Sequence, residues 1–302
     1  MVNLRKIVHL KNTKKLIIIT GQQRSGKTTL SQLLSSFKGP VNIRIECFID
    51  SLMSLKRLKL ISKKVLEEII EIYLHNLIID NQYGRNLNFR KDEDSSIWNS
   101  SNPGFFIKKI NKKFTKKEIK INLKKNYNNE LILVLHNLIE LIKFFPVNNY
   151  KVNIINIFSH PIDQIYSMYK SKTNFKFDNL VREPIYKYKG KKYCLTVGYE
   201  NKLKKLNTMQ KILILKKNSD DLETKNKKIL KKNFKFINIF YDDIILKPFN
   251  TIEKVSKFIK KNPSNFTYTK IKKNNDKRKF LTTRSREARL NFIIKKLKLN
   301  KY

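Results

Sequence analysis

The sequence predicts an α/β fold in which helices flank a central, mostly parallel β-sheet. Short runs rich in β-branched residues alternate along the chain with longer amphipathic stretches, and strands that alternate with helices form parallel sheets covered on both faces. The 302 residues, 40% of them hydrophobic, are enough for one sizeable core. We expect a single domain over residues 1–302, with a long insertion loop at about 81–105 and a basic C-terminal segment at about 270–302.

Each predicted strand is a short apolar run, and each predicted helix repeats its apolar residues at intervals of three and four. The strands are expected, in chain order, at Leu16–Thr20, Val41–Ile45, Val152–Phe158 and Phe236–Tyr241. The helices are expected at Thr28–Phe37, Leu52–Ile79, Glu130–Phe145, Ile162–Lys172, Glu200–Lys217, Thr251–Lys260 and Arg284–Leu297. The insertion loop is predicted because its 25 residues hold Gly84, Pro103, Gly104 and four serines.

The charge is unusual, because 66 lysines and arginines against 24 acidic residues give a net charge of +42. Such an excess is found in proteins that bind nucleic acid or anionic membranes. The lysines, however, spread along the whole chain, and arginine, which contacts guanine and phosphate with two hydrogen bonds, is scarce beside lysine. Because asparagine and isoleucine are also abundant, AT-rich coding explains the composition better. We expect attraction for small anions, and nucleic acid is not an expected partner.

Two cysteines, Cys47 and Cys194, are too few to hold a secreted scaffold together, so a reducing compartment is expected. The longest apolar runs, such as Leu131–Leu135, are much shorter than the ~20 residues of a membrane span. The first residues lead into no signal-peptide core. These features predict a cytoplasmic protein without a membrane span. No metal site is expected, because His75 has no metal-binding spacing with another histidine or cysteine.

A phosphate-binding loop is predicted by Gly21-Gln22-Gln23-Arg24-Ser25-Gly26-Lys27-Thr28, which matches G-x-x-x-x-G-K-[ST] at every position. A buried strand precedes the loop and an amphipathic helix follows it. Backbone N–H groups of such a loop, together with the helix N-terminus, face one anion. Lys27 would contact phosphoryl oxygens and Thr28 would donate its hydroxyl. The motif predicts a three-layer P-loop-type fold that binds a nucleotide, but it is shared by kinases, nucleoside triphosphatases and sulfotransferases.

Three segments, in the same order along the chain, resemble the sulfotransferase superfamily. Arg24-Ser25-Gly26 followed by Thr28-Thr29-Leu30 is similar to the R-S-G-T-T-L phosphosulfate loop of that family. The stretch from Phe158 to Tyr169 resembles its R-x-P-x-D-x-x-x-S-x-Y segment. The third segment, which resembles Y-E-D-L…P…T…K…F-L, is Phe240-Tyr241-Asp242-Asp243-Ile244 with Pro248, Thr251, Lys254 and Phe258. The resemblance covers residues 16 to about 260.

The resemblance implies that 3′-phosphoadenosine-5′-phosphosulfate is the co-substrate and that its sulfuryl group passes to a hydroxyl or amine without a metal. The long polar loop suggests a carbohydrate acceptor. Ser167, with Ser159 beside it, is expected at the 3′-phosphate of the donor. Arg24 and Lys27 are expected to stabilise charge on the departing nucleotide. The residues expected to hold the 5′-phosphosulfate are Gly21, Arg24, Ser25, Gly26, Lys27, Thr28 and Thr29.

Glu46 is the expected general base. Family members whose loop begins R-S-G carry a glutamate about twenty residues further on, just after the second strand, and Glu46 directly follows Val41–Ile45. A carboxylate there would take the acceptor proton as the S–O bond forms. The alternative interpretation of Glu46 is a strand-end carboxylate paired with Arg44 or with a lysine.

The sequence departs from the family pattern at two positions. Ser159 replaces the arginine that precedes the proline by two residues, and Ser159 with His160 at a helix N-terminus would compensate for it. Basic residues near the C-terminus are further candidates for that role. Lys27 stands where sulfotransferases carry threonine and nucleotide kinases carry lysine. The C-terminal candidates are Lys277, Arg278, Lys279, Arg284 and Arg286.

Two other functions stay open. Lys27-Thr28, with a strand that ends at Asp242, fits an ATP- and Mg²⁺-dependent kinase. The charge and the missing arginine at position 159 fit a basic nucleotide- or nucleic-acid-binding protein without turnover. His136 falls inside the predicted helix Glu130–Phe145, and we interpret it as structural rather than catalytic.

Overall fold

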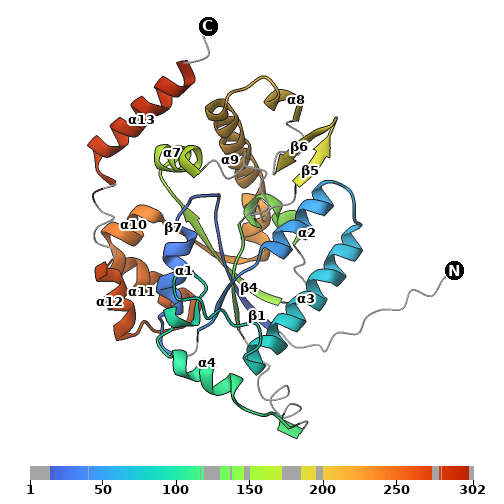
Figure 1. Cartoon of the computed structure of the whole chain (residues 1–302), viewed down its shortest axis with the longest axis vertical. Coiled ribbons are helices and arrows are strands. Elements are labelled where there is room, and N and C mark those ends of the chain that lie inside the picture. Colours follow the sequence, from blue (N-terminus) through green and yellow to red (C-terminus); the bar gives the residue numbers. More distant parts are fainter. Residues whose placement is uncertain are drawn as a thin grey trace, which may run out of the picture.

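A parallel sheet of five strands lies at the centre of the computed structural model (Figure 1). The structure describes residues 14–39, 41–115, 117–118, 130–136, 138–145, 150–171, 185–194, 200–273, 279 and 281–298. The order within the sheet is β2-β3-β1-β4-β7, and each neighbouring pair is parallel. The five strands are β1 (Lys14–Thr20), β2 (Ile43–Ile45), β3 (Leu131–Val134), β4 (Tyr150–Phe158) and β7 (Lys235–Phe240). All four strands predicted from the sequence are confirmed, and β3 is an additional one.

Helices cover both faces of the sheet, which confirms the predicted three-layer α/β fold of P-loop type. The helices are α1 (Lys27–Ser35), α2 (Cys47–Arg57), α3 (Lys63–Tyr83), α4 (Pro103–Ile110), α6 (Leu138–Leu141), α7 (Pro161–Ser171), α8 (Glu200–Leu203), α9 (Thr208–Asn233), α10 (Tyr241–Leu246), α11 (Pro248–Ile259), α12 (Asn265–Lys273) and α13 (Thr283–Lys298). Two short 3₁₀ helices are η1 (Ile97–Asn99) and η2 (Ile142–Phe144). None of the described helices combines the length and the hydropathy that a membrane crossing requires.

The side chains of β1 alternate between two hydrophobic cores. Leu16 and Ile18 belong to the core that α2, α3, α6 and α9 complete, whereas Ile17 and Ile19 belong to the core with α1, α10, α11 and α12. Successive side chains of a strand point to opposite faces of its sheet. Because all four residues are 0% exposed, β1 is buried on both sides, as expected for the central strand of a covered parallel sheet.

The single helix predicted over Glu130–Phe145 is wrong. Residues Leu131–Val134 form β3, between β2 and β1, and only Leu138–Leu141 is α-helical. The β3 side chains are buried on both faces, with Leu131 and Leu133 in one core and Ile132 and Val134 in the other. A strand buried on both faces has a continuous apolar run, and periodicity alone does not distinguish it from a buried helix.

Two further predicted helices are each divided in two. The helix expected over Leu52–Ile79 breaks after α2, where Lys59 has a positive φ of 62°, and α3 begins after Ser62, whose hydroxyl accepts a hydrogen bond from the Val65 N–H. The helix expected over Glu200–Lys217 is divided between α8 and α9. Asn207 and Gln210 form a capping box at the start of α9, a motif that fixes a helix N-terminus.

The predicted insertion loop is shorter than expected, because α3 extends to Tyr83 and α4 begins at Pro103. Gly84 ends α3 with a left-handed φ of 67°, the usual role of glycine at that position. A hairpin of β5 (Ile185–Tyr188) and β6 (Lys191–Cys194) was not predicted. Its turn, Lys189-Gly190, has φ values of 47° and 76°, and two positive φ angles match the right-handed twist of the strands.

Candidate functional site

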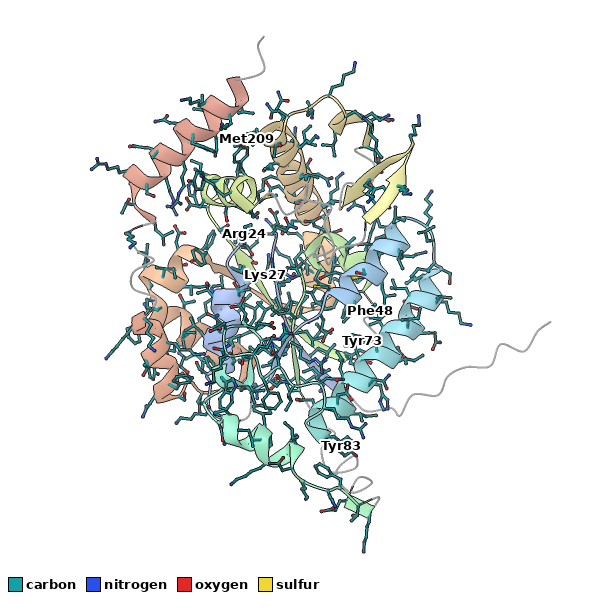
Figure 2. The ribbon with its side chains drawn as sticks, in the orientation of Figure 1. Arg24, Lys27, Phe48, Tyr73, Tyr83 and Met209 are labelled. Carbon is teal, nitrogen blue, oxygen red and sulfur yellow. The ribbon has the colours of Figure 1, made fainter. Side chains whose placement is uncertain are left out.

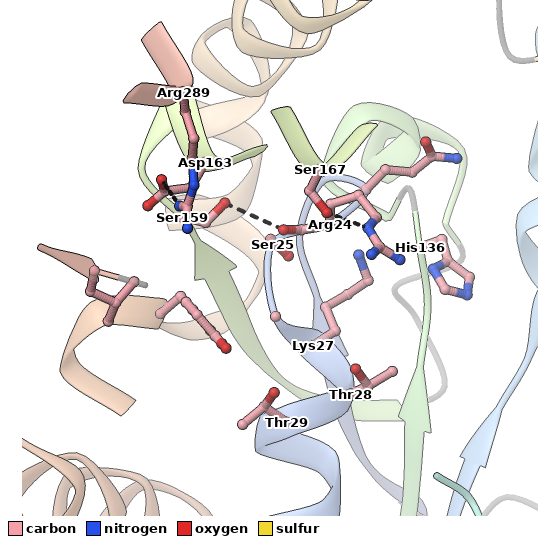
Figure 3. Close-up of a pocket in the computed structure, with 14 residues that line it drawn as sticks. Arg24, Ser25, Lys27, Thr28, Thr29, His136, Ser159, Asp163, Ser167 and Arg289 are labelled. Atoms are coloured by element: carbon pink, nitrogen blue, oxygen red, sulfur yellow. Dashed lines mark hydrogen bonds and ion pairs between the residues drawn. The ribbon is translucent and has the colours of Figure 1, made fainter. Parts of the chain in front are cut away.

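Four neighbouring strands end at one cavity of about 420 Å³. The loop 21–26 follows β1, His136 lies after β3, Ser159 follows β4 and Tyr241 follows β7. In open parallel sheets, ligands bind beyond the carboxyl ends of the strands, where the chain order changes direction. The residues that line the cavity are Gln23, Arg24, Ser25, Gly26, Lys27, Thr28, Thr29, His136, Ser159, Asp163, Ser167, Tyr241, Leu281 and Arg289 (Figure 3).

Two glycines allow the loop after β1 to curl tightly against its neighbours. A Cβ atom on Gly21 would lie 2.3 Å from the Ile157 carbonyl oxygen, and one on Gly26 would lie 2.1 Å from the Tyr241 ring. Their φ angles of 146° and 94° also fall in the region that favours glycine. Gly26 immediately precedes α1, so the positive end of the α1 dipole faces the cavity. The backbone here has the shape and polarity of an anion site.

Ser25 adds a hydroxyl to the polar groups of this loop. Its Oγ is buried and has no hydrogen-bond partner among the described residues. Buried polar atoms are usually paired, so the unpaired Ser25 hydroxyl is available to a ligand in the cavity. Thr28 and Thr29 line the same cavity, and Thr29 is hydrogen-bonded to Tyr241, whose hydroxyl pKa is raised by burial and held back by that bond.

Lys27 folds back onto the loop. Its Nζ donates hydrogen bonds to the Gly21 and Gln22 carbonyl oxygens, both at 2.7 Å, and the residue is only 5% exposed. Burial lowers the pKa of the Lys27 ammonium to about 8, although Asp50, Glu140 and Glu223 oppose that shift. Lys27 therefore lies at the cavity as a buried cation, and its hydrogen bonds join the end of the loop to its beginning.

Arg24 connects the loop to α7. Its φ of 61° is left-handed, a conformation that costs a non-glycine residue on the order of 1 kcal/mol. In this conformation the Arg24 Nε donates to the Ser167 Oγ at 2.8 Å, and the Ser159 hydroxyl approaches the Arg24 carbonyl oxygen at 3.5 Å (Figure 3). The structure thus brings the predicted residues Ser159 and Ser167 to the same cavity as the loop.

Two arginines of α13 and two aspartates form an ion-pair cluster on the side of the loop opposite His136 (Figure 3). Arg286 pairs with Asp163 at 3.0 Å and with Asp242 at 2.6 Å, and Arg289 pairs with Asp163. Arg289 lines the cavity, whereas Arg286 does not. Of the C-terminal candidates, Lys277 and Arg278 lie outside the described residues, and Arg284 is exposed. Among the described C-terminal arginines, Arg289 is the one that lines the cavity, and it was not among the candidates predicted from the sequence.

His136 is a cavity residue that the sequence analysis interpreted as structural. It lies just after β3, next to β1, and not in a helix. Its backbone N–H donates to Asp50 Oδ2 at 2.7 Å, which joins this turn to α2. The sequence signal that could have identified it is a histidine directly after the apolar run Leu131–Leu135, since polar residues at the carboxyl ends of parallel strands lie at ligand sites.

Glu46 does not line the cavity. It follows β2, and β3 separates β2 from β1. Adjacent strands lie ~4.8 Å apart, so a residue after β2 lies about two strand spacings from the loop. The Glu46 carboxylate is 6% exposed and accepts hydrogen bonds from Arg44 Nε at 2.9 Å and from the Tyr73 hydroxyl. Figure 2 shows Tyr73 on α3, apart from Arg24 and Lys27. The pairing with Arg44 is therefore present, and the role of Glu46 as a base stays a prediction.

Within the part of the chain that the structure describes, no group of three or more histidine, cysteine, aspartate or glutamate side chains is arranged to hold a metal ion. Asp242, the carboxylate that a kinase would use for Mg²⁺, is ion-paired with Arg286.

Comparison with known proteins identifies the family. A family model described as the sulfotransferase domain matches residues 14–296. Among solved structures, the chain is similar to the sulfotransferase domain from the curacin biosynthetic pathway, at 12% identity and a TM-score of 0.42, covering 86% of this chain and 78% of that one. It is also similar to the sulfotransferase domain of the Synechococcus PCC 7002 olefin synthase, at 13% identity and a TM-score of 0.41, covering 88% and 80%. A search of curated proteins gives no match. Because the family model spans nearly the whole chain, the protein belongs to the sulfotransferase family and is an enzyme of that class.

Proposed function

We propose that the enzyme transfers a sulfuryl group from 3′-phosphoadenosine-5′-phosphosulfate to a hydroxyl or amine of its acceptor. The observation that carries this proposal is the cavity itself, in which the anion-binding loop, with its own Arg24, lies beside Ser167 and Arg289. The donor has anionic groups at its 5′ and 3′ positions, and the cavity offers cations and hydroxyls on both sides of the loop.

The residues present fit such a donor. The unpaired Ser25 hydroxyl, the glycine curl and the α1 N-terminus suit the 5′-phosphosulfate. Ser159, Ser167 and Arg289 suit the 3′-phosphate, and Arg289 takes the place of the arginine that is missing at position 159. Asp163 also lines the cavity, but Arg286 and Arg289 offset the charges of Asp163 and Asp242. A ligand with two separated phosphate groups therefore meets a neutral ion-pair cluster, together with the cations Arg24 and Lys27.

The chemistry requires a cation at the leaving group and a proton acceptor at the acceptor hydroxyl. As the S–O bond to the donor breaks, negative charge grows on the departing phosphate oxygen, and Lys27 and Arg24 stabilise it. As the new S–O bond forms, the acceptor oxygen must lose its proton. His136 lines the cavity and has a side chain that can accept that proton, whereas the Asp163 carboxylate is paired with Arg286 and Arg289, so we assign the role to His136. Figure 3 shows His136 on the side of the loop opposite Arg289, so we place the acceptor there.

Glu46 is the alternative base. For Glu46 to act, its carboxylate would have to give up its hydrogen bonds with Arg44 and Tyr73. The pKa of the Tyr73 hydroxyl is raised by burial and, in addition, by its hydrogen bond to Glu46. Glu46 also follows β2, which is two strands away from β1 in the sheet, whereas His136 already lines the cavity. The geometry favours His136 for this reason.

The acceptor and the cellular location are further parts of the proposal. We propose a hydroxyl of a carbohydrate, from the polar segment between α3 and α4, and a cytoplasmic location, from the cysteine content. In the structure that segment packs on α1, where Gln32 Nε2 donates to Asp94 Oδ1 at 2.5 Å. A screen of acceptors with donor labelled in the sulfuryl group identifies the class directly.

Nucleotide binding tests the donor. We expect 3′,5′-adenosine bisphosphate to raise the melting temperature without Mg²⁺, because a ligand that binds only the folded state stabilises it by mass action. ATP with Mg²⁺ serves as the comparison. Stabilisation by ATP with Mg²⁺ alone would replace the proposal with a kinase, and steeply salt-dependent binding of nucleic acid without a nucleotide response would replace it with a binding protein.

A further inference from the structure

Helix α9 carries a polar stripe on the side that faces the phosphate loop. Lys216, Ser219, Asp220, Glu223 and Asn226 follow one another at intervals of one to four residues, so they share one side of the helix. Glu223 is 8% exposed and Asn226 is 6% exposed. Burying a carboxylate is unfavourable unless it has partners, so the partners of this stripe indicate what it does.

Gln22, in the phosphate loop, is the partner that connects the stripe to the site. Its Nε2 donates to Asp220 Oδ1 at 2.8 Å, and its side chain is also hydrogen-bonded to Glu223. Its Oε1 accepts from Gln164 Nε2 of α7 at 3.3 Å. The Gln22 carbonyl oxygen in turn accepts from Lys27 Nζ. One loop residue therefore connects Lys27 to two carboxylates of α9.

Carboxylates from three helices act on the Lys27 ammonium. Asp50 of α2, Glu140 of α6 and Glu223 of α9 each favour its charged form, while Arg24 of the loop disfavours it. Glu140 is itself hydrogen-bonded to Ser219 of the stripe. In a chain with only 24 acidic residues against 66 basic ones, three carboxylates around one buried lysine are more than an even distribution of charge would place there.

We propose that Asp50, Glu140 and Glu223 are positioning residues that keep Lys27 charged, and that α9 is thereby part of the phosphate-binding machinery. The reason is the burial of Lys27, which favours the neutral amine, and a neutral amine gives little attraction to a phosphate oxygen. The carboxylates oppose that loss without touching the ligand. The part of this inference that concerns the donor rests on the proposed function, but the charge of Lys27 can be measured without any donor.

The direct test is an NMR titration of the lysine Cε signals of the full chain. Lys27 and Lys270 both have a pKa of about 8, lowered chiefly by burial, so Lys270→Arg is the background variant and Lys27→Met assigns the signal. We expect Glu223→Gln to move the Lys27 titration to lower pH. The matched control is Asp221→Asn, an exposed carboxylate on the same helix, which should leave that titration in place.

The pH dependence separates charge from structure. Burial raises the pKa of the Glu223 carboxyl to about 7, with Glu140 and Asp220 adding to the shift and Lys216 and Gln22 opposing it. Below that pH Glu223 is neutral, and Glu223→Gln should bind 3′,5′-adenosine bisphosphate as the wild type does. At pH 8.5 its affinity should fall about threefold below wild type, the loss that half a unit in the Lys27 pKa produces.

Each outcome decides one part of the proposal. A Lys27 titration that is unchanged in Glu223→Gln and in Glu140→Gln overturns it, and Glu140→Gln also serves if Glu223→Gln does not fold. A moved titration with an equal loss of bisphosphate affinity at pH 6 and pH 8.5 overturns the role in binding and leaves a structural one. If the wild type binds no bisphosphate at any pH, the proposed function fails, while the titration still decides whether the three carboxylates hold the charge of Lys27.

Discussion

The Arg24 guanidinium donates a hydrogen bond to the Ser167 hydroxyl at 2.8 Å, although the two residues are 143 positions apart in the chain. This bond connects the phosphate loop after β1 to α7 after β4, and β1 and β4 are neighbours in the sheet. A ligand that spans both segments meets a cation and a hydroxyl already in place. The bond thus connects the two halves of the proposed donor site.

Replacement of Ser167 tests that connection. Ser167→Ala removes the hydroxyl and frees Arg24, so we expect affinity for 3′,5′-adenosine bisphosphate to fall at least tenfold, the effect of one hydrogen bond to a charged group at ~1.5 kcal/mol or more. Adenosine 5′-monophosphate should lose much less, because it lacks the 3′-phosphate. Ser171→Ala is the control, because the Ser171 hydroxyl on the same helix bonds only to the Met168 carbonyl oxygen in the hydrogen bonds described. Equal losses for both nucleotides would contradict the role of Ser167.

The two candidate bases are distinguished by paired substitutions. His136→Gln should lower kcat by about 10²–10⁴-fold with nearly unchanged bisphosphate affinity, the usual contribution of general base catalysis. Glu46→Gln should keep most of the turnover and lower the melting temperature, since it weakens the pairing with Arg44 and Tyr73. The opposite pattern, with full turnover in His136→Gln and none in Glu46→Gln, would restore the prediction made from the sequence.

The sequence could predict the loop but not which residues after the other strands reach its cavity, and the order of the strands explains why. The loop is contiguous, so its motif, the strand before it and the helix after it are all readable from Leu16 to Leu30. The neighbours of β1 are set by tertiary packing. Because β3 lies between β2 and β1, His136 reaches the cavity and Glu46 does not. The apolar run Leu131–Val134 is predicted to be helical, so β3, the strand that separates β2 from β1, is missing from the prediction.

Site residues that are far from the loop in the sequence are difficult to predict for the same reason. Ser159 and Ser167 lie in one contiguous segment that resembles a family motif, and both line the cavity. Arg289 reaches the same cavity from α13, more than a hundred residues later, through its ion pair with Asp163. No local pattern distinguishes it from the other arginines of α13, because its position depends on how that helix packs on α7. Phe292 fixes this packing, with its ring 5.3 Å from Tyr166 and 5.4 Å from Tyr169.

Arg289 is predicted to contribute to affinity for the 3′-phosphate. Arg289→Gln should weaken 3′,5′-adenosine bisphosphate about tenfold, and the loss should shrink at high salt because screening weakens the attraction that the arginine provided. Lys295→Gln removes an exposed charge from the same helix and controls for net charge. An Arg289→Gln variant that binds bisphosphate with wild-type affinity at low salt would show that the 3′-phosphate lies elsewhere.

Gly26 is predicted to be irreplaceable for reasons that Gly39 does not share. Both have left-handed φ angles, 94° and 89°, but a Cβ on Gly26 would overlap the Tyr241 ring, whereas one on Gly39 would meet no described atom within 4 Å. Gly39→Ala should therefore destabilise the fold by only ~1 kcal/mol. Gly26→Ala adds the steric overlap and should abolish nucleotide binding as well. Thermal melts and calorimetry of the two variants check this, and wild-type binding by Gly26→Ala would mean that Tyr241 moves aside without effect on the site.

Because of Lys27, the folding stability of the free protein and its affinity for nucleotide are predicted to change in opposite directions as the pH rises. Its pKa is about 8 in the folded chain and about 10.4 when unfolded. Between these values the unfolded state binds more protons, so the stability of the free protein should rise with pH by at most about 3 kcal/mol from this group. Nucleotide affinity should fall over the same range, because the phosphate loses its cation.

Comparison with Lys27→Met isolates this response. Other lysines also lose protons in this range, which reduces the self-repulsion of a chain with a net charge of +42, so the wild type minus the variant is the quantity to measure. Denaturant melts from pH 7 to pH 10 should give a wild-type stability that rises more steeply than that of Lys27→Met. Lys270 has a similarly low pKa, and Lys270→Arg should reduce the rise in stability without changing the fall in nucleotide affinity, since Lys270 lies outside the cavity. Parallel curves for the wild type and Lys27→Met would mean that Lys27 has the same, ordinary pKa in the folded and unfolded chain and remains mostly charged over this range.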